Sequence, residues 1–207
     1  RDSLKNLVIG SEGTLGIITA ATMKLFSKPK DRSVALIAVG SPKDALRLLS
    51  EAKDYFGETI SAFELINKMG IQFLKETGLN FKFPLSAIPE WMVLLEIGHS
   101  VRFGTEKNIN DFFENILSSS LALDGALAEN MRQQNDLWAI RENIPEANRR
   151  IGSVSSHDIS LPLSEVSDFV EQARIEISKL GQFRINCFGH LGDGNLHFNI
   201  FPEKGNN

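Results

Sequence analysis

The feature that most constrains the fold is a regular alternation, between residues 33 and 201, of short apolar runs and longer stretches with helical periodicity. The expected strands are 33–39, 59–65, 91–97, 125–129, 155–160, 183–190 and 195–201. The expected helices are 42–56, 67–76, 105–117, 130–150 and 164–180. This order favours an α+β fold, in which a repeated unit builds an antiparallel sheet with its helices on one face.

Composition places the chain among ordinary globular proteins. Of its 207 residues, 42% are hydrophobic and 23% are charged, and the formal net charge is −4. Such a chain forms one or two domains without needing a disulfide, and its single cysteine, Cys187, cannot form an internal one. The acidic balance argues against a nucleic-acid partner, and no apolar run is long enough to span a membrane.

Residues 1–30 differ in pattern from the rest of the chain. Two expected strands, 6–9 and 17–19, flank a turn that has glycines at positions 10, 13 and 16. Glycines at this spacing favour close backbone approach, so the turn is either a tight hairpin or a cradle for a phosphate or nucleotide ring. It lacks the Gly-Lys-Ser/Thr ending of a P-loop. A polar segment with a proline, 28–31, then marks the expected domain boundary.

The segment from Gly189 to Asn199 carries the clearest chemical signal. Asp193-Gly194 is typical of a two-residue hairpin loop, which would place His190 directly opposite His197. Opposed residues have Cβ atoms about 4.5–5.5 Å apart, so the two imidazoles could share one metal ion, with Asn199 on the same face. The alternative is a chance pair on a solvated face. A catalytic zinc site usually has three protein ligands, and the third could lie outside this chain.

Arg141 lies on the expected helix 130–150, four residues before Pro145. Because proline removes a backbone hydrogen bond, the helix is expected to kink there. Arg141 flanks the apolar stripe of the helix, a position from which it could reach a cleft, and its planar guanidinium suits a carboxylate substrate. The alternative is an ordinary ion pair with Glu142 or Glu146.

Two long motifs, Gly10 to Thr19 and Gly189 to His197, resemble signatures of the FAD-linked oxidase family. This vanillyl-alcohol-oxidase-like group contains D-2-hydroxyglutarate dehydrogenase, the nearest branch, and D-lactate dehydrogenase. Segments 138–142 and 157–162 also resemble that family, in the same order, so the resemblance covers essentially the whole chain.

The resemblance implies two parts. Residues 1–30 would be the tail of an FAD-binding domain, and residues 31–207 would be a ferredoxin-like substrate or cap domain, incomplete at its C-terminus. The first residue is Arg1 and not Met, so we expect a fragment. We expect this fragment to be inactive on its own, because contacts to FAD and one metal ligand would be missing. The residues implied to lie along FAD are Ser11, Glu12, Gly13, Thr14, Gly16, Ile17 and Ile18.

The resemblance also implies a reaction. His190 and His197 would be catalytic residues that bind a divalent metal, expected to be zinc, which polarises the 2-hydroxyl of a small D-2-hydroxy acid. Arg141 would hold the carboxylate, Asn199 would contact the substrate, and FAD would accept a hydride from C2. The electron acceptor is unknown and a homo-oligomer is left open. The implied location is cytoplasmic or, in a eukaryote, mitochondrial.

The chain departs from the family pattern at two substrate-binding positions. Where D-2-hydroxyglutarate dehydrogenases carry a threonine and a lysine, this chain has Pro145 and Ser156. Loss of the lysine favours a monocarboxylate, such as D-lactate or glycolate, over 2-hydroxyglutarate. The usual Glu-His-Gly, which supplies the third metal ligand, would lie beyond Asn207. The alternatives are a non-catalytic binding module of the same fold and a metal-dependent hydrolase that uses the two histidines.

Overall fold

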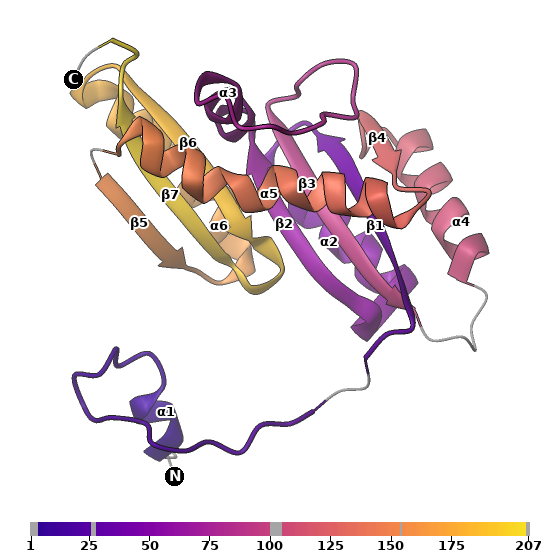
Figure 1. Ribbon diagram of the computed structural model, residues 1–207, viewed down its shortest axis with the longest axis horizontal. Helices are drawn as coiled ribbons and strands as arrows, with labels where there is room; N and C mark the ends of the chain where they lie inside the picture. The colour runs from indigo at the N-terminus through magenta and orange to yellow at the C-terminus, as the bar shows by residue number, and fades with distance from the viewer. Residues whose placement is uncertain (1–3, 26–27, 100–104, 154, 206–207) are drawn as a thin grey trace.

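The computed structural model describes residues 4–25, 28–99, 105–153 and 155–205. Within these residues, seven strands form one antiparallel sheet in the order β4-β1-β3-β2-β6-β7-β5 (Figure 1). The strands are β1 (Asp31–Val39), β2 (Ile60–Asn67), β3 (Trp91–His99), β4 (Asp124–Leu127), β5 (Ser155–Ser160), β6 (Phe183–His190) and β7 (Asn195–Pro202). The helices are α1 (Leu4–Val8), α2 (Pro42–Phe56), α3 (Lys68–Glu76), α4 (Thr105–Ser118), α5 (Met131–Ile151) and α6 (Leu163–Leu180), with 3₁₀ turns η1 (Gly57–Thr59) and η2 (Leu191–Asp193).

The first four strands form the expected ferredoxin-like unit. Their spatial order, β4-β1-β3-β2, with α2 between β1 and β2 and α4 between β3 and β4, is that of the split β-α-β arrangement. The second half of the chain extends this sheet by adding β6, β7 and β5 beside β2. The expectation of an α+β fold with an antiparallel sheet is therefore confirmed.

The helices cover both faces of the sheet, so the expectation of helices on one face is wrong. One core packs α2, α4 and α6 against the sheet, and a second core packs α3 and α5 against the opposite face. Figure 1 shows α5 crossing the near face while α2, α4 and α6 lie behind the strands. The physical reason is visible in β1, whose residues Val34 to Val39 are all buried. A strand that is apolar at every position must be covered on both sides.

The expected strands 6–9 and 17–19 are also wrong. Residues 4–8 form the short helix α1, and residues 9–25 contain no strand. Apolar β-prone residues form a strand only where a neighbouring strand accepts their backbone hydrogen bonds, and the described part of the chain offers none here. Large side chains in this segment face solvent, including Ile17, which is 90% exposed, and Leu25, which is 88% exposed.

Candidate active site

The sheet face under α5 is apolar at one end and polar at the other. The polar end comprises Glu64 of β2, Asn186 and His190 of β6, and His197 and Asn199 of β7. Their common face follows from the register, because Glu64 pairs with His190 and Asn186 pairs with Asn199. The expectation that Asn199 shares a face with His197 is confirmed. The structure therefore brings Arg141, His190, His197 and Asn199 to one region.

Glu64 lies at the centre of this region and was not singled out from the sequence. Its carboxylate is 3% exposed and accepts a 2.8 Å hydrogen bond from Arg141 Nε through Oε2. Its other oxygen, Oε1, lies 2.5 Å from His190 Nδ1. The sequence signal was a charged residue inside the apolar strand Phe63 to Ile66, since a buried carboxylate requires a charged or hydrogen-bonding partner.

Arg141 is buried, at 8% exposure, and its ion-pair partner is Glu64. The alternative ion pair with Glu142 or Glu146 is wrong, because Glu146 instead bonds Arg149 and Arg150. The Arg141 guanidinium also lies over the Phe188 ring, with Cζ 4.8 Å from the ring centroid. Among the described residues, Nε makes the one hydrogen bond of this side chain, so the two terminal nitrogens are available for a ligand.

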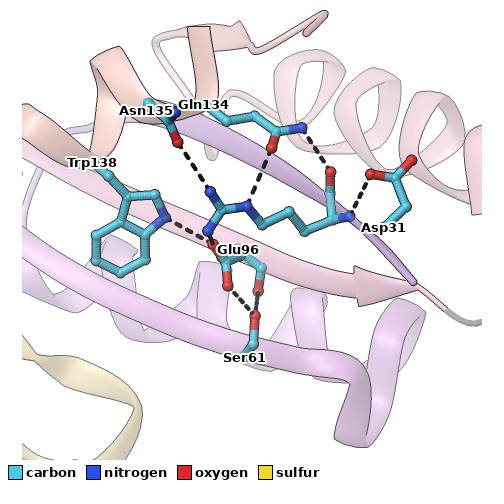
Figure 2. A network of polar contacts seen from close by, with 7 residues as sticks. Asp31, Ser61, Glu96, Gln134, Asn135 and Trp138 are labelled. Atoms are coloured by element: carbon cyan, nitrogen blue, oxygen red, sulfur yellow. Dashed lines mark hydrogen bonds and ion pairs between the residues drawn. The ribbon is translucent and has the colours of Figure 1, made fainter. Parts of the chain in front are cut away.

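A second, partly buried carboxylate holds the preceding turn of α5. Glu96 of β3 accepts a 2.8 Å bond from the Trp138 indole and a 2.7 Å bond from the Ser61 hydroxyl, an arrangement that Figure 2 shows. Arg32 of β1 joins Glu96 to Gln134 of α5. These bonds fix the rotation of α5 about its axis, and thereby the direction in which Arg141 leaves the helix.

The turn between β6 and β7 differs from the expected two-residue loop. Leu191 to Asp193 form the 3₁₀ turn η2, and Gly194 adopts a left-handed conformation with φ 71°. His197 therefore pairs with Phe188 and not with His190, so the expected direct opposition of the two histidines is wrong. His190 pairs instead with Glu64. The longer loop shifts the register while leaving both histidines on the α5 face.

Two glycines make this turn possible. A side chain at Gly194 would bring its Cβ to 2.1 Å from the Leu161 carbonyl oxygen. A side chain at Gly189, whose φ is 143°, would bring its Cβ to 2.9 Å from the Asn195 carbonyl oxygen. Because ordinary Cβ atoms do not approach so closely, both positions require glycine. They explain two of the glycines in the motif that contains His190.

His197 is packed more tightly than His190. Its ring lies 4.9 Å from the Phe188 ring, and its Nδ1 lies 3.7 Å from a carboxylate oxygen of Asp158 on β5. Burial lowers the pKa of His197 below its ordinary value, against an opposing effect of Asp158. The ring is therefore held towards its neutral form, which is the form that binds metals.

A cavity of about 430 Å³ opens beside His197. It is lined by Pro145, Asn148, Arg149, Gly152, Ser153, Ser156, Phe188, His197 and Asn199. The lining contains no carboxylate, and its one permanent cation, Arg149, makes two 2.8 Å bonds to Glu146. The cavity thus presents mainly neutral hydrogen-bonding groups, and its lining includes Pro145 and Ser156, the two positions at which the resemblance led us to expect a departure from the family pattern.

The donor set of the site fits a divalent metal in part. Glu64 contacts Nδ1 of His190, and about half of this histidine side chain is exposed, which leaves the Nε2 edge of the ring accessible. A carboxylate on the far nitrogen is the usual environment of a metal-ligating histidine. Within the described residues, however, no three His, Cys, Asp or Glu side chains are grouped as metal ligands. On this sheet face the described residues offer two candidate ligands, His190 and His197.

The conformation and exposure of the glycine-rich segment are compatible with contact to a bound molecule. Gly10 and Gly13 have positive φ values, of 78° and 80°, and Glu12 has a φ of 48°. Gly16 has no such φ, and a Cβ built there would meet nothing within 4 Å. The chain itself therefore gives no reason for glycine at Gly16. Ser11 to Ile18 are nearly all exposed, so their backbone groups could contact a flat cofactor.

The sequence profile of the family described as FAD linked oxidases, C-terminal domain, matches residues 28–207. The chain belongs to this family. None of the helices in the described residues is long and apolar enough to cross a membrane.

The chain spans less than half the length of the named relatives that it matches. The chain is 35% identical over 202 residues to the mitochondrial D-2-hydroxyglutarate dehydrogenase of Danio rerio, a match that spans 97% of this chain and 37% of that protein. It is 34% identical over 203 residues to the Arabidopsis thaliana enzyme of the same name, spanning 98% of this chain and 36% of that protein. A D-2-hydroxyglutarate–pyruvate transhydrogenase of Saccharomyces cerevisiae is 27% identical over 205 residues, a match that spans 95% of this chain and 41% of that protein.

Solved structures support the fold. Alkyldihydroxyacetonephosphate synthase superposes with a TM-score of 0.57 at 16% identity, covering 96% of this chain and 41% of that one. p-Cresol methylhydroxylase superposes with a TM-score of 0.52 at 9% identity, covering 86% and 40%. At these identities the likeness concerns the fold alone.

Proposed function

We propose that the protein is an FAD-dependent dehydrogenase that oxidises a D-2-hydroxy acid to the 2-oxo acid, and that this chain supplies its substrate-binding side. The observation that carries the proposal is the hydrogen-bonded series Arg141–Glu64–His190, whose first two members are buried, on the same sheet face as a cavity lined by His197 and Asn199. A buried guanidinium with two available nitrogens, next to two imidazoles, suits a small acid with an oxygen on the adjacent carbon. The names of the D-2-hydroxyglutarate dehydrogenase relatives support the same class.

In this proposal each side chain has one role. Arg141 binds the substrate carboxylate through its terminal nitrogens, because its Nε is already bonded to Glu64. Asn199, whose amide lines the cavity, orients the substrate by hydrogen bonding. His190 and His197 would hold a divalent metal together with a ligand from elsewhere. When bound, FAD supplies the hydride acceptor for C2 and the metal supplies a Lewis acid for the 2-hydroxyl.

The glycine-rich segment would contribute to the flavin site. We infer that Ser11, Glu12, Gly13, Thr14, Gly16, Ile17 and Ile18 lie along FAD and that residues 1–30 belong with the FAD-binding part of the protein. The exposed Ile17 and Leu25 support this, since large apolar side chains are normally covered in a complete protein. The proposed boundary at residue 30 lies beside the start of β1 at Asp31.

The cavity favours a monocarboxylate substrate. The distal carboxylate of a dicarboxylic acid would need a cation, and Arg149 is engaged by Glu146. The neutral Ser153 and Ser156 offer hydroxyl groups in its place. D-lactate or glycolate therefore suits the site better than D-2-hydroxyglutarate.

The test is a substrate panel with the natural protein at its full length. Flavin reduction is followed with D-lactate, glycolate and D-2-hydroxyglutarate, and with L-lactate as the stereochemical control. We expect Arg141→Lys to raise the KM for the preferred acid about 10-fold or more, since lysine lacks the planar pair of donors. Arg150→Lys is the matched control, because Arg150 is an exposed arginine outside the cavity. A flavin-loaded protein that reduces with none of the D-acids would refute the proposal and favour a binding module.

A further inference from the structure

We propose that Glu64 is a positioning residue that sets two functional groups at once: the tautomer of His190 and the direction of Arg141. The roles of these two residues rest on the proposed function, but the geometry does not. The two oxygens of one carboxylate are divided between them, Oε2 to Arg141 and Oε1 to His190. No other residue in the described part of the chain contacts both through hydrogen bonds.

The burial of Glu64 makes this arrangement specific. Its side chain is 4% exposed, so water cannot substitute for a lost partner without opening the core. An ionised carboxylate only accepts hydrogen bonds, and both of its neighbours must therefore donate. In the neutral imidazole of His190 the single proton must then reside on Nδ1, which leaves the lone pair on Nε2 of this half-exposed ring. At Arg141 the Nε donor is used, which reserves the terminal nitrogens.

A glutamine at this position cannot accept hydrogen bonds from both neighbours. Its amide has one accepting oxygen and one donating nitrogen, whereas Arg141 Nε can only donate. If the oxygen stays on Arg141, the amide nitrogen faces His190 Nδ1, and the imidazole must move its proton to Nε2. If the oxygen turns to His190, two donors face each other at Arg141. Glu64→Gln therefore disturbs one of the two groups although its size hardly changes.

The fold provides a matched control. Glu96 is a second, partly buried carboxylate on the same sheet face; it also holds α5, and it makes no hydrogen bond to either histidine in the described structure. Glu96→Gln removes a charge from the anchoring network while leaving the Glu64 bonds in place. If a variant acts only by weakening the attachment of α5, Glu64→Gln and Glu96→Gln should behave alike. An effect on the His190 tautomer should appear only in Glu64→Gln.

The decisive experiment reads the His190 tautomer by long-range ¹H–¹⁵N NMR in the metal-free, full-length protein, at a pH where imidazole is neutral. His190→Gln assigns the signals. We expect the proton on Nδ1 in the unaltered protein and in Glu64→Asp and Glu96→Gln, and on Nε2 in Glu64→Gln. A proton on Nε2 in the unaltered protein overturns the proposal, and this measurement does not depend on any variant folding.

A second measurement follows ligand binding without turnover. Isothermal titration with Zn²⁺, and separately with oxalate as a carboxylate probe, is compared across the same proteins. We expect Glu64→Gln to weaken the binding of one or both probes about 10-fold or more, and Glu96→Gln to change neither by more than about 2-fold. Equal losses in the two variants overturn the proposal. A protein with the expected tautomer that oxidises no 2-hydroxy acid would count against the proposed function and leave the positioning role intact.

Discussion

Glu64 and Glu96 occupy diagonal positions on neighbouring strands of one sheet face, and each holds a different turn of α5. Glu64 bonds Arg141, and Glu96 bonds Trp138, three residues earlier on the helix. The register places Glu64 opposite Leu94 and Glu96 opposite Ala62. Two fixed points on one helix determine both its rotation and its position along the sheet. The guanidinium of Arg141 is therefore placed by the framework rather than by a mobile loop.

Gly194→Ala is expected to destabilise the protein by more than about 3 kcal/mol, since it combines a left-handed conformation with a severe clash. A Cβ there would lie 2.1 Å from the Leu161 carbonyl oxygen. Gly205→Ala is the control, because Gly205 also has a positive φ but has nothing within 4 Å of a Cβ. Urea unfolding of both variants measures the difference. Similar losses in the two would show that backbone conformation alone, and not the contact with Leu161, requires glycine at Gly194.

The buried amides of Asn148 and Asn186 predict a strongly non-additive double-mutant cycle. Asn186 donates one 2.9 Å bond to Asn148, while Asn148 Nδ2 and Asn186 Oδ1 lack partners within the described structure. Asn148→Leu should cost about 1–3 kcal/mol, because it leaves Asn186 entirely unpaired. Adding Asn186→Leu should recover most of that loss by removing the unpaired group. Denaturation of the four proteins gives the cycle, and simple addition of the two single losses would contradict it.

The pKa of Glu146 is expected to be about 2, below its ordinary value of 4.5, because Arg149 and Arg150 hydrogen-bond to its ionised form. A lowered carboxyl pKa stabilises the folded state fully above pH 4.5, and this contribution is lost as the pH falls towards 2. Glu146→Gln should remove that part of the pH dependence of stability. NMR titration of the carboxyl carbon checks the value. Since the group is exposed, about 1 M salt should return the pKa towards 4.5, and no such return would indicate a different cause.

Ser156→Lys is expected to shift substrate preference towards dicarboxylic acids. Ser156 lines the cavity beside His197, and a lysine there would add a second cation to a cavity whose Arg149 is paired with Glu146. The ratio of kcat/KM for D-2-hydroxyglutarate to that for D-lactate should rise about 10-fold or more. Ser155→Lys is the control, because alternation turns residue 155 to the opposite face of β5. An equal shift in both variants would indicate a non-specific effect of charge.

Much of the fold was predictable from local patterns. Periodicity located the strands and helices after residue 30 to within a few residues, because in this domain local preference and tertiary packing agree. The region that failed, residues 6–19, carries strand-like composition without a strand to pair with. The residue types of a segment indicate only its intrinsic preference for strand, whereas a strand also requires an adjacent strand with which to pair.

The site was predictable as a set of residues but not as a geometry. Arg141, His190, His197 and Asn199 do gather on one sheet face. The prediction that the two histidines lie directly opposite each other was wrong because the turn is longer than two residues: it contains η2 as well as Gly194. The Asp-Gly pair indicates a turn but does not specify its length. Glu64 was missed because its partners are distant in sequence and only tertiary structure brings them together.

Because helices cover both faces of the sheet, substitutions at neighbouring positions of one strand should have different effects. Along β7, Leu196 and Phe198 point into the core beneath α2 and α6, whereas His197 and Asn199 point towards the site. In a complete substitution library, changes at the first pair should lower the amount of folded protein. Changes at the second pair should leave its abundance nearly normal and lower activity per molecule. Adjacent codons on one strand would thus carry two distinct phenotypes.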